Sequence, residues 1–337
     1  MVRKSLSLFT ALDGFVRSKE AAGKSQYTIR NYRQTIDKVR AYFGEDDPEL
    51  KALDRAAWEE FMAWLQNEYT TDGGGIAKRK LRPLSPKSVC NIHTDLSSFY
   101  TWATSHGVEL VDEHIFRYIE RPGYELPLIE PFTKDEVEKL LKACDVASPW
   151  HNHASVMSLR PTRYRDRAIV HVLLSTGVRA AEMCNIRFRD LDMATRTISV
   201  AGKGKGRDSK PRHVHFGKTA SAALWRYLSE LIEGSKPEDY VFMVDINGVP
   251  RPMDRNILLR LLRRIGERAG VPDVHPHRFR HTFATEFLRN GGDLLALQRL
   301  LGHTTLEMVR VYAHVVSADL ERQHARSDPN DNWHLKP

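Results

Sequence analysis

A proline-rich segment, residues 121–131, constrains the fold more than any other part of this sequence. It holds three prolines in eleven residues and shows no helical spacing of apolar side chains. Proline lacks a backbone donor and biases the residue before it toward extended backbone, so this stretch interrupts any helix. It predicts an extended linker, 122–131, between two domains at 1–121 and 132–317, followed by a C-terminal tail at 318–337.

Apolar residues at helical spacing dominate the first domain. One stripe runs from Phe9 to Val16, a second from Ile29 to Phe43 and a third from Trp58 to Leu65. A fourth follows Ser85-Pro86, an N-cap residue with proline at the first helical position. We therefore expect this domain to be helical throughout.

Positive charge is unevenly distributed along the chain. Residues 1–130 carry a net charge of −1 and residues 131–337 a net charge of +9. Such an excess is typical of a domain that binds a phosphate backbone, although a solvated basic surface gives the same count. The first domain has one basic cluster that can bind DNA phosphates or be a solvated loop. Its residues are Lys78, Arg79, Lys80 and Arg82, with Lys87 just beyond.

The sequence lacks the marks of a secreted or membrane protein. No apolar run reaches the ~18 residues that span a bilayer, and residues 1–10 lack the apolar core of a signal peptide. The cysteines, Cys90, Cys144 and Cys184, are far apart and form no CxxC pair, which indicates reduced thiols. We expect a cytoplasmic protein that does not bind a membrane.

The second domain mixes helical and strand patterns. Thr133 and Glu136 form a capping box, and a helix from Asp166 to Leu174 should close at Gly177. β-type residues on both sides of a Gly/Lys-rich loop predict a hairpin, with strands at 195–201 and 212–216. Further helices are expected near residues 220–232, 254–269, 277–289, 294–300 and 306–311.

Single residues in this domain have ordinary explanations. Arg179 and Glu182, one helical turn apart, fit a surface ion pair. Lys203 lies in a glycine-rich stretch, 202–206, that lacks P-loop spacing and fits a flexible turn. Residues 293–314 resemble a helix-turn-helix, and plain helical packing explains them as well.

Three closely spaced histidines raise the question of a metal site. They are His275, His277 and His281, and a histidine pair four residues apart on a helix can bind zinc. No glutamate follows in HExxH fashion, and no acidic third ligand lies nearby. We therefore predict no metal site.

The ordered set of these residues is far more specific than its members. The set comprises Arg179, Lys203, His277-Arg-Phe-Arg280, Leu301-Gly-His303 and Tyr312. It resembles the tyrosine recombinase (lambda integrase) family, including its Xer and Cre types. The matching segments are Ser175-Thr-Gly-Val-Arg-Ala-Ala-Glu182, residues 276–285, residues 301–303 and Val311-Tyr-Ala-His314. In the first domain, residues 84–89 and 99–102 look like the family's core-binding domain.

The resemblance implies a site-specific DNA recombinase with Tyr312 as nucleophile. The tyrosine would form a covalent 3′-phosphotyrosyl link and release a 5′ hydroxyl, and religation to another strand would follow. The phosphotyrosine retains the bond energy, so neither ATP nor another cofactor is expected. Arg179 and Arg280 can present planar forks of donors to the phosphate oxygens. His277 and His303 can supply further donors, and one of them can accept the tyrosine proton.

Two further roles follow from the resemblance. Lys203 would protonate the departing 5′ oxygen. The loop from Gly202 to Arg212 is longer than is usual in the family, so Lys205 is the alternative acid and otherwise a DNA-binding candidate. Glu182 would hold Arg179 in place.

The expected fold is mainly α with a small β-sheet: a helical, SAM-like core-binding domain followed by an α+β catalytic domain. The expected partners are a double-stranded recombination site and other copies of the chain, which form a tetramer on DNA in a prokaryotic, phage or mobile-element setting. Residues 313–322 can dock on a neighbouring protomer or fold back on their own domain. Two alternative functions are a type IB topoisomerase-like relaxing enzyme and a DNA-binding regulator without chemistry.

Overall fold

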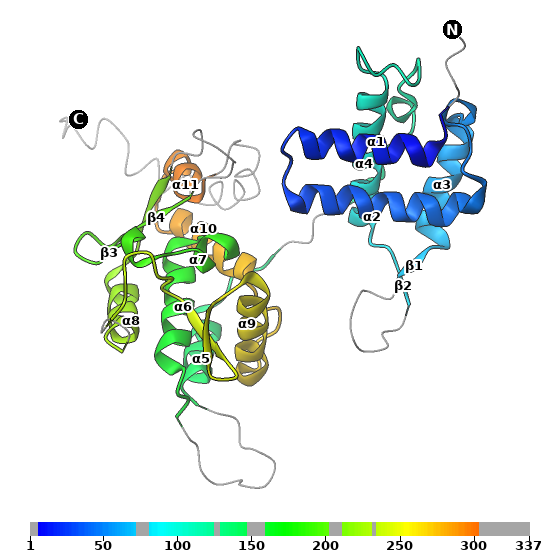
Figure 1. Ribbon diagram of the computed structural model, residues 1–337. Helices are drawn as coiled ribbons and strands as arrows, with labels where there is room; N and C mark the ends of the chain where they lie inside the picture. The colour runs from blue at the N-terminus through cyan, green and yellow to red at the C-terminus, as the bar shows by residue number, and fades with distance from the viewer. Residues whose placement is uncertain are drawn as a thin grey trace, which may run out of the picture. The chain divides into compact units, whose positions relative to one another are not determined.

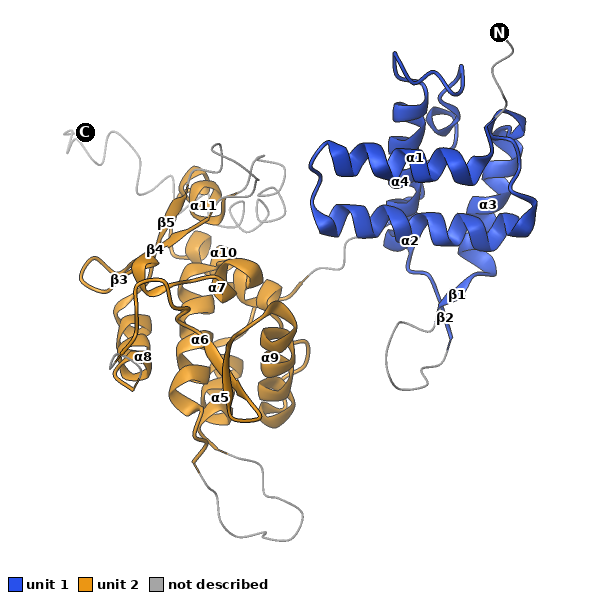
Figure 2. Ribbon diagram, in the orientation of Figure 1, with its two compact units in different colours: residues 1–127 blue, residues 128–337 orange. Residues whose placement is uncertain are grey.

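Two compact units, residues 1–127 and 128–337, make up the chain (Figure 2). The computed structural model describes residues 6–71, 81–124, 129–146, 159–201, 211–230 and 234–302. The basic residues Lys78, Arg79 and Lys80 and the expected helix at 306–311 lie outside these ranges.

Four helices make up most of the described part of unit 1, as the sequence predicts: α1 (Leu8–Ala21), α2 (Gln26–Phe43), α3 (Arg55–Asn67) and α4 (Pro86–Ala103) (Figure 1). Their starts follow local chemistry, because Ser25, Asp54 and Ser85 each accept a hydrogen bond from a backbone N–H in the first turn. Three short 3₁₀ turns, at 44–46, 50–52 and 115–117, complete the connections.

The core of unit 1 is aromatic. Trp58, Phe61, Phe99 and Tyr100 are fully buried, and Phe15 packs edge-on against Phe99. The indole N–H of Trp58 donates to the Tyr100 hydroxyl over 2.8 Å, which satisfies both buried polar groups. The apolar stripes read from the sequence therefore meet in one core.

A short strand pair that the sequence did not predict includes Arg82 of the basic cluster in unit 1. Strands β1 (Thr70–Thr71) and β2 (Arg82–Pro83) pair in antiparallel fashion. Strands of two residues are too short to show an alternating pattern, so the sequence gives no signal for them. Arg82 on β2 and Lys87 on α4 are both exposed.

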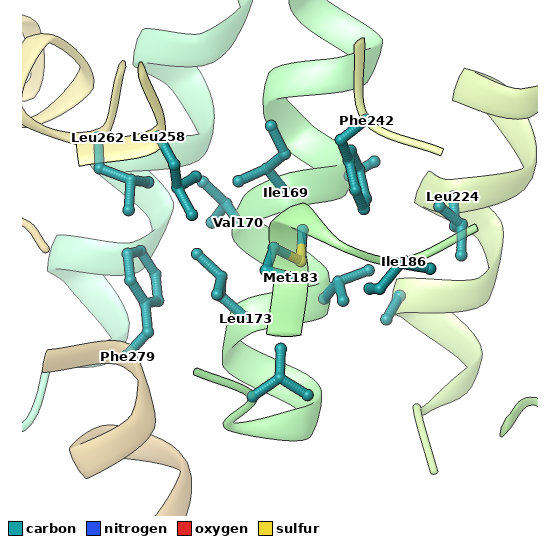
Figure 3. Packing of buried hydrophobic residues seen from close by; sticks show 14 of the residues in the cluster. Ile169, Val170, Leu173, Met183, Ile186, Leu224, Phe242, Leu258, Leu262 and Phe279 are labelled. Atoms are coloured by element: carbon teal, nitrogen blue, oxygen red, sulfur yellow. The ribbon is translucent and has the colours of Figure 1, made fainter. Parts of the chain in front are cut away.

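Helices surround a central helix in unit 2. Helix α6 (Arg163–Thr176) packs against α5 (Lys134–Asp145), α8 (Lys218–Leu228) and α10 (Pro276–Arg289). Helix α9 (Arg255–Ala269) packs on α5 and on the short α7 (Ala180–Cys184), and α11 (Leu294–Leu301) packs on α10. Residues Ile169, Val170 and Leu173 of α6 meet side chains from these neighbours (Figure 3), namely Met183, Leu224, Leu258, Leu262 and Phe279.

A three-stranded antiparallel sheet lies against this helical core. Strands β4 (Thr197–Val200) and β5 (Arg212–His215) form the predicted hairpin, with Ile198 opposite Val214 and both buried. The sequence did not predict β3 (Leu191–Asp192), which pairs with β4 after a 3₁₀ turn at 188–190. The observed architecture, helical with small sheets, is the one that the sequence predicts.

The sequence also did not predict a second hairpin in unit 2. It is formed by β6 (Met243–Ile246) and β7 (Val249–Pro252). Asn247 and Gly248 connect the strands, both with positive φ, as a two-residue type I′ turn requires. The Asn-Gly pair was a usable signal. It was obscured because β7 contains two prolines and is exposed along its whole length.

No helix within the described ranges is both long enough and apolar enough to cross a membrane.

Gly177 ends α6 in a conformation that few other residues adopt. Its φ of 59° lies in the left-handed region, and its backbone N–H caps the helix by donating to Leu173 O. A Cβ at this position would approach Phe283 to 2.6 Å and Leu301 to 3.1 Å. The glycine therefore allows α10 and α11 to approach the end of α6.

We expect Gly177→Ala to destabilise unit 2 by about 2–4 kcal/mol, because both backbone strain and overpacking oppose it. Gly270→Ala is the matched control: Gly270 has a φ of 65° at the end of α9, and a Cβ there would meet nothing within 4 Å. Backbone strain alone should cost about 1 kcal/mol there. Denaturant unfolding measures both losses, and equal losses would show that the packing around Gly177 is not restrictive.

Candidate active site

Arg179 is the N-cap residue of α7 and lies two residues after Gly177. As the residue before the first helical turn, it accepts at its own carbonyl, while its backbone N–H donates to Glu182 Oε2 over 2.8 Å. Its guanidinium Nη1 donates to Glu182 Oε1 over 2.9 Å. The side chain is 30% exposed and lines a surface hollow of about 610 Å³ beside β4. Arg179 is thus both oriented and accessible.

Glu182 connects Arg179 to β5. Its carboxylate accepts a bidentate pair of hydrogen bonds from Arg212 Nη1 and Nη2, each 2.8 Å long. Burial acts to raise the pKa of Glu182, but the hydrogen bonds from Arg212 and from the Arg179 backbone outweigh it and lower the pKa. Glu182 is therefore ionised and held between two cations.

Arg280 is the fifth residue of α10, just past its first turn, and is almost completely buried. Its Nη1 donates to Gly177 O over 2.8 Å and its Nη2 to Leu301 O over 2.7 Å. The side chain therefore joins the turn before α7 to the C-terminal end of α11.

Three successive carbonyl oxygens at the end of α11 accept from three different arginines. Leu300 O accepts from Arg212 Nε over 2.9 Å, and Leu301 O accepts from Arg280. Gly302 O accepts from Arg179 Nη2 over 3.1 Å. The last carbonyls of a helix have no partner within it and carry partial negative charge, which explains why cations gather there. Guanidinium groups from α7, β5 and α10 are thus brought to one point, immediately before His303 in the chain.

Two neighbours of Arg280 in the motif, His277 and Arg278, lie in surroundings that differ from those of Arg280. His277, the second residue of α10, is exposed. Arg278 is buried, donates to Glu130 O, Pro272 O and the Glu136 carboxylate, and lies over the Phe132 ring. Arg278 thus attaches α10 to the start of α5, and only one of the two arginines in the motif reaches the α11 end.

Comparisons with known proteins find matches to both parts of the chain. The sequence pattern described as the phage integrase family matches residues 130–318, and that of the phage integrase SAM-like domain matches residues 7–116. The chain belongs to the phage integrase family. It is a tyrosine recombinase, a class of site-specific DNA recombination enzymes.

Similar members of the family include bacterial tyrosine recombinases. XerC of Oceanobacillus iheyensis is 30% identical over 314 residues, which cover 91% of this chain and 92% of that protein. XerC of Bacillus subtilis is 28% identical over 311 residues, covering 90% and 91%. A Tn1549 transposon integrase solved with circular intermediate DNA shares the fold, with a TM-score of 0.69 and 18% sequence identity. The match covers 94% of this chain and all of that one.

Several residues that the sequence assigns to the site of this phage integrase lie outside the described ranges: Lys203, Lys205, His303 and Tyr312. Of the other candidates, Arg179, Glu182 and Arg280 come together at the end of α11. Arg82 and Lys87 belong to unit 1. Within the described ranges, no three or more His, Cys, Asp or Glu side chains group in a way that could hold a metal ion.

Sequence reasoning missed Arg212. The sequence marks it only as the end of the glycine-rich loop, and nothing local distinguishes it from the lysines and arginines nearby. Its partners, Glu182 and Leu300, lie 30 and 88 residues away. Only the packing of β5 against α7 and α11 identifies it.

Proposed function

We propose that this chain cuts and rejoins DNA at specific sites through a 3′-phosphotyrosine on Tyr312. One observation carries the proposal. Arg179 and Arg280, which are 101 residues apart, donate to the neighbouring carbonyls of Gly302 and Leu301. Two planar cations at one point provide the donors that a phosphodiester needs as it gains negative charge.

The proposed reaction exchanges one phosphodiester for another. The Tyr312 oxygen attacks the phosphorus, a bond forms between them, and the bond to the 5′ oxygen breaks. His277 or His303 takes the phenol proton, and Lys203 or Lys205 gives a proton to the 5′ oxygen. The 5′ hydroxyl of another strand then reverses these steps, so that no ATP or metal ion is required.

Arginine suits the phosphate better than lysine here, because its planar fork can address two oxygens at once. Arg179 has the more accessible position, while Arg280 acts from a buried one in which hydrogen bonds are stronger. Glu182 keeps Arg179 oriented through two hydrogen bonds, one to its backbone and one to its side chain. The phosphate then meets an arranged pair of cations.

Double-stranded DNA is the proposed partner. The Tn1549 integrase was solved with circular intermediate DNA and XerH with a palindromic difH substrate (TM-score 0.63, 22% identity, covering 93% of this chain and 83% of that one). We propose residues 1–121 as a DNA clamp and residues 132–317 as the catalytic domain. The clamp would use Lys78, Arg79, Lys80, Arg82 and Lys87.

Four chains would assemble on DNA through the tail at 318–337, in the cytoplasm of a prokaryote. The comparisons do not favour a topoisomerase or a non-catalytic regulator.

The test is capture of the covalent intermediate. The full chain is incubated with sheared genomic DNA of its host in EDTA and then denatured. One part of the adduct is digested to a peptide that retains a nucleotide, and the DNA attached to the remainder is sequenced. We expect the nucleotide on Tyr312 by mass spectrometry, and a common sequence at the attached DNA ends. Attachment to another residue, or no attachment, would refute the proposal. Adduct formation that requires added zinc would restore the three-histidine metal site.

A further inference from the structure

Arg212 uses all three nitrogens of its guanidinium within the protein. Nη1 and Nη2 bind the two oxygens of Glu182, and Nε binds Leu300 O. Its side chain is only 15% exposed, so water does not compete effectively for these bonds. A fork with three fixed partners on α7 and α11 acts as a rigid connection between the two helices.

The end of α11 is shaped to receive this guanidinium. Gly302 has a φ of 62°, and a Cβ there would lie 3.1–3.2 Å from three atoms of the Arg212 guanidinium. Arg212 therefore packs on the bare backbone of Gly302, the residue next to His303. The glycine of the Leu-Gly-His motif is required by this contact as well as by its own backbone conformation.

The contacts of Glu182 explain what Arg212 does for Arg179. Arg179 Nη1 and Arg212 Nη1 share the same oxygen, Oε1 of Glu182. Without Arg212, the buried carboxylate would lose both bidentate bonds and draw the Arg179 guanidinium toward itself. Arg179 would then give up its position at Gly302 O, where it is placed to receive a phosphate.

We propose that Arg212 is a positioning residue for strand cleavage, which holds Arg179 through Glu182 and fixes the end of α11 to which Arg179 donates. The inference rests on the proposed function. It concerns a side chain that is not expected to touch DNA. Arg212 acts on Arg179, which is proposed to bind the scissile phosphate. Arg212 begins the strand that follows the loop of Lys203 and Lys205, but it is not proposed to serve these lysines.

The test compares Arg212→Gln with the wild-type chain on the duplex recovered from the trapped adduct. We expect single-turnover cleavage to fall about 10²-fold, as misplacement of a catalytic group by about 1 Å does, with DNA affinity kept within about threefold. Arg212→Lys keeps the charge but not the fork and should lose about tenfold. It also provides the measurement if the glutamine variant does not fold. Arg263→Gln is the control, because Arg263 is 75% exposed and pairs with Glu267 on the same helix.

A double-mutant cycle separates positioning from a general effect on structure. If Arg212 acts through Arg179, adding Arg212→Gln to Arg179→Gln should slow cleavage little further. Independent effects would multiply, giving another 10²-fold loss, and would overturn the inference. Cleavage by Arg212→Gln or Arg212→Lys at the wild-type rate would also overturn it.

A substrate with sulfur at the 5′ leaving position gives a second check. A sulfur leaving group departs without help from an acid. It therefore compensates for loss of Lys203 or Lys205, whichever is the acid, but not for a displaced Arg179. We expect the Arg212→Gln defect to persist on this substrate, and recovery of the wild-type rate would show that Arg212 serves the lysine instead. Failure of the wild-type chain itself to form an adduct would refute the proposed function, which is a separate result.

Discussion

Tyr312→Phe is expected to abolish DNA cleavage and leave DNA affinity within about threefold. The substitution removes only the phenolic oxygen that would attack phosphorus, while the cations that attract the phosphate backbone remain. Single-turnover assays should show no covalent adduct, and a gel-shift titration should show unchanged binding.

Tyr164→Phe is the matched control for this prediction. Tyr164 lies on α6, and its hydroxyl accepts a hydrogen bond from the adjacent Arg163. Its loss should not change cleavage. An adduct formed by the Tyr312 variant would mean that another side chain is the nucleophile.

Arg280→Ala is expected to slow cleavage by about 10³–10⁵-fold, which is the range that arginines contribute when they stabilise phosphoryl-transfer transition states. The same range is expected for Arg179→Ala. Arg280 also holds Gly177 O and Leu301 O, so its removal should destabilise unit 2 by about 1–3 kcal/mol for each carbonyl left without a donor. Cleavage rates are therefore compared per folded molecule, with the folded fraction measured by circular dichroism.

Arg278→Ala controls for the loss of stability. Arg278 is a buried arginine two residues from Arg280, and its partners are Glu130, Pro272 and Glu136 rather than the α11 end. It should lower the free energy of unfolding by a similar amount and leave cleavage per folded molecule nearly unchanged. Equal losses of cleavage in the two variants would show that Arg280 has a structural role only.

Local signals explain why the helices could be predicted well. Ser85 with Pro86, the Thr133–Glu136 capping box and Gly177 all act within one helical turn, so the sequence alone contains the whole interaction. The strand pairs were harder to predict. β1, β2 and β3 have two residues each, and β7 carries two prolines, so their pairing is visible only once the partner is in place.

The sequence by itself determined the fold class and the family, because a set of motifs in a fixed order and spacing can be recognised without a structure. It also predicted which residue types form the site. It also placed Glu182 one turn after Arg179, a contact that a single helical turn produces. Tertiary structure alone decided that Arg179, Arg212 and Arg280 gather on three successive carbonyls of α11. Those carbonyls are unsatisfied only because α11 ends there, and the arginines reach them only because α7, β5 and α10 pack around that end. Hydrogen bonds between residues 21 to 123 positions apart depend on this packing, and no local pattern encodes them.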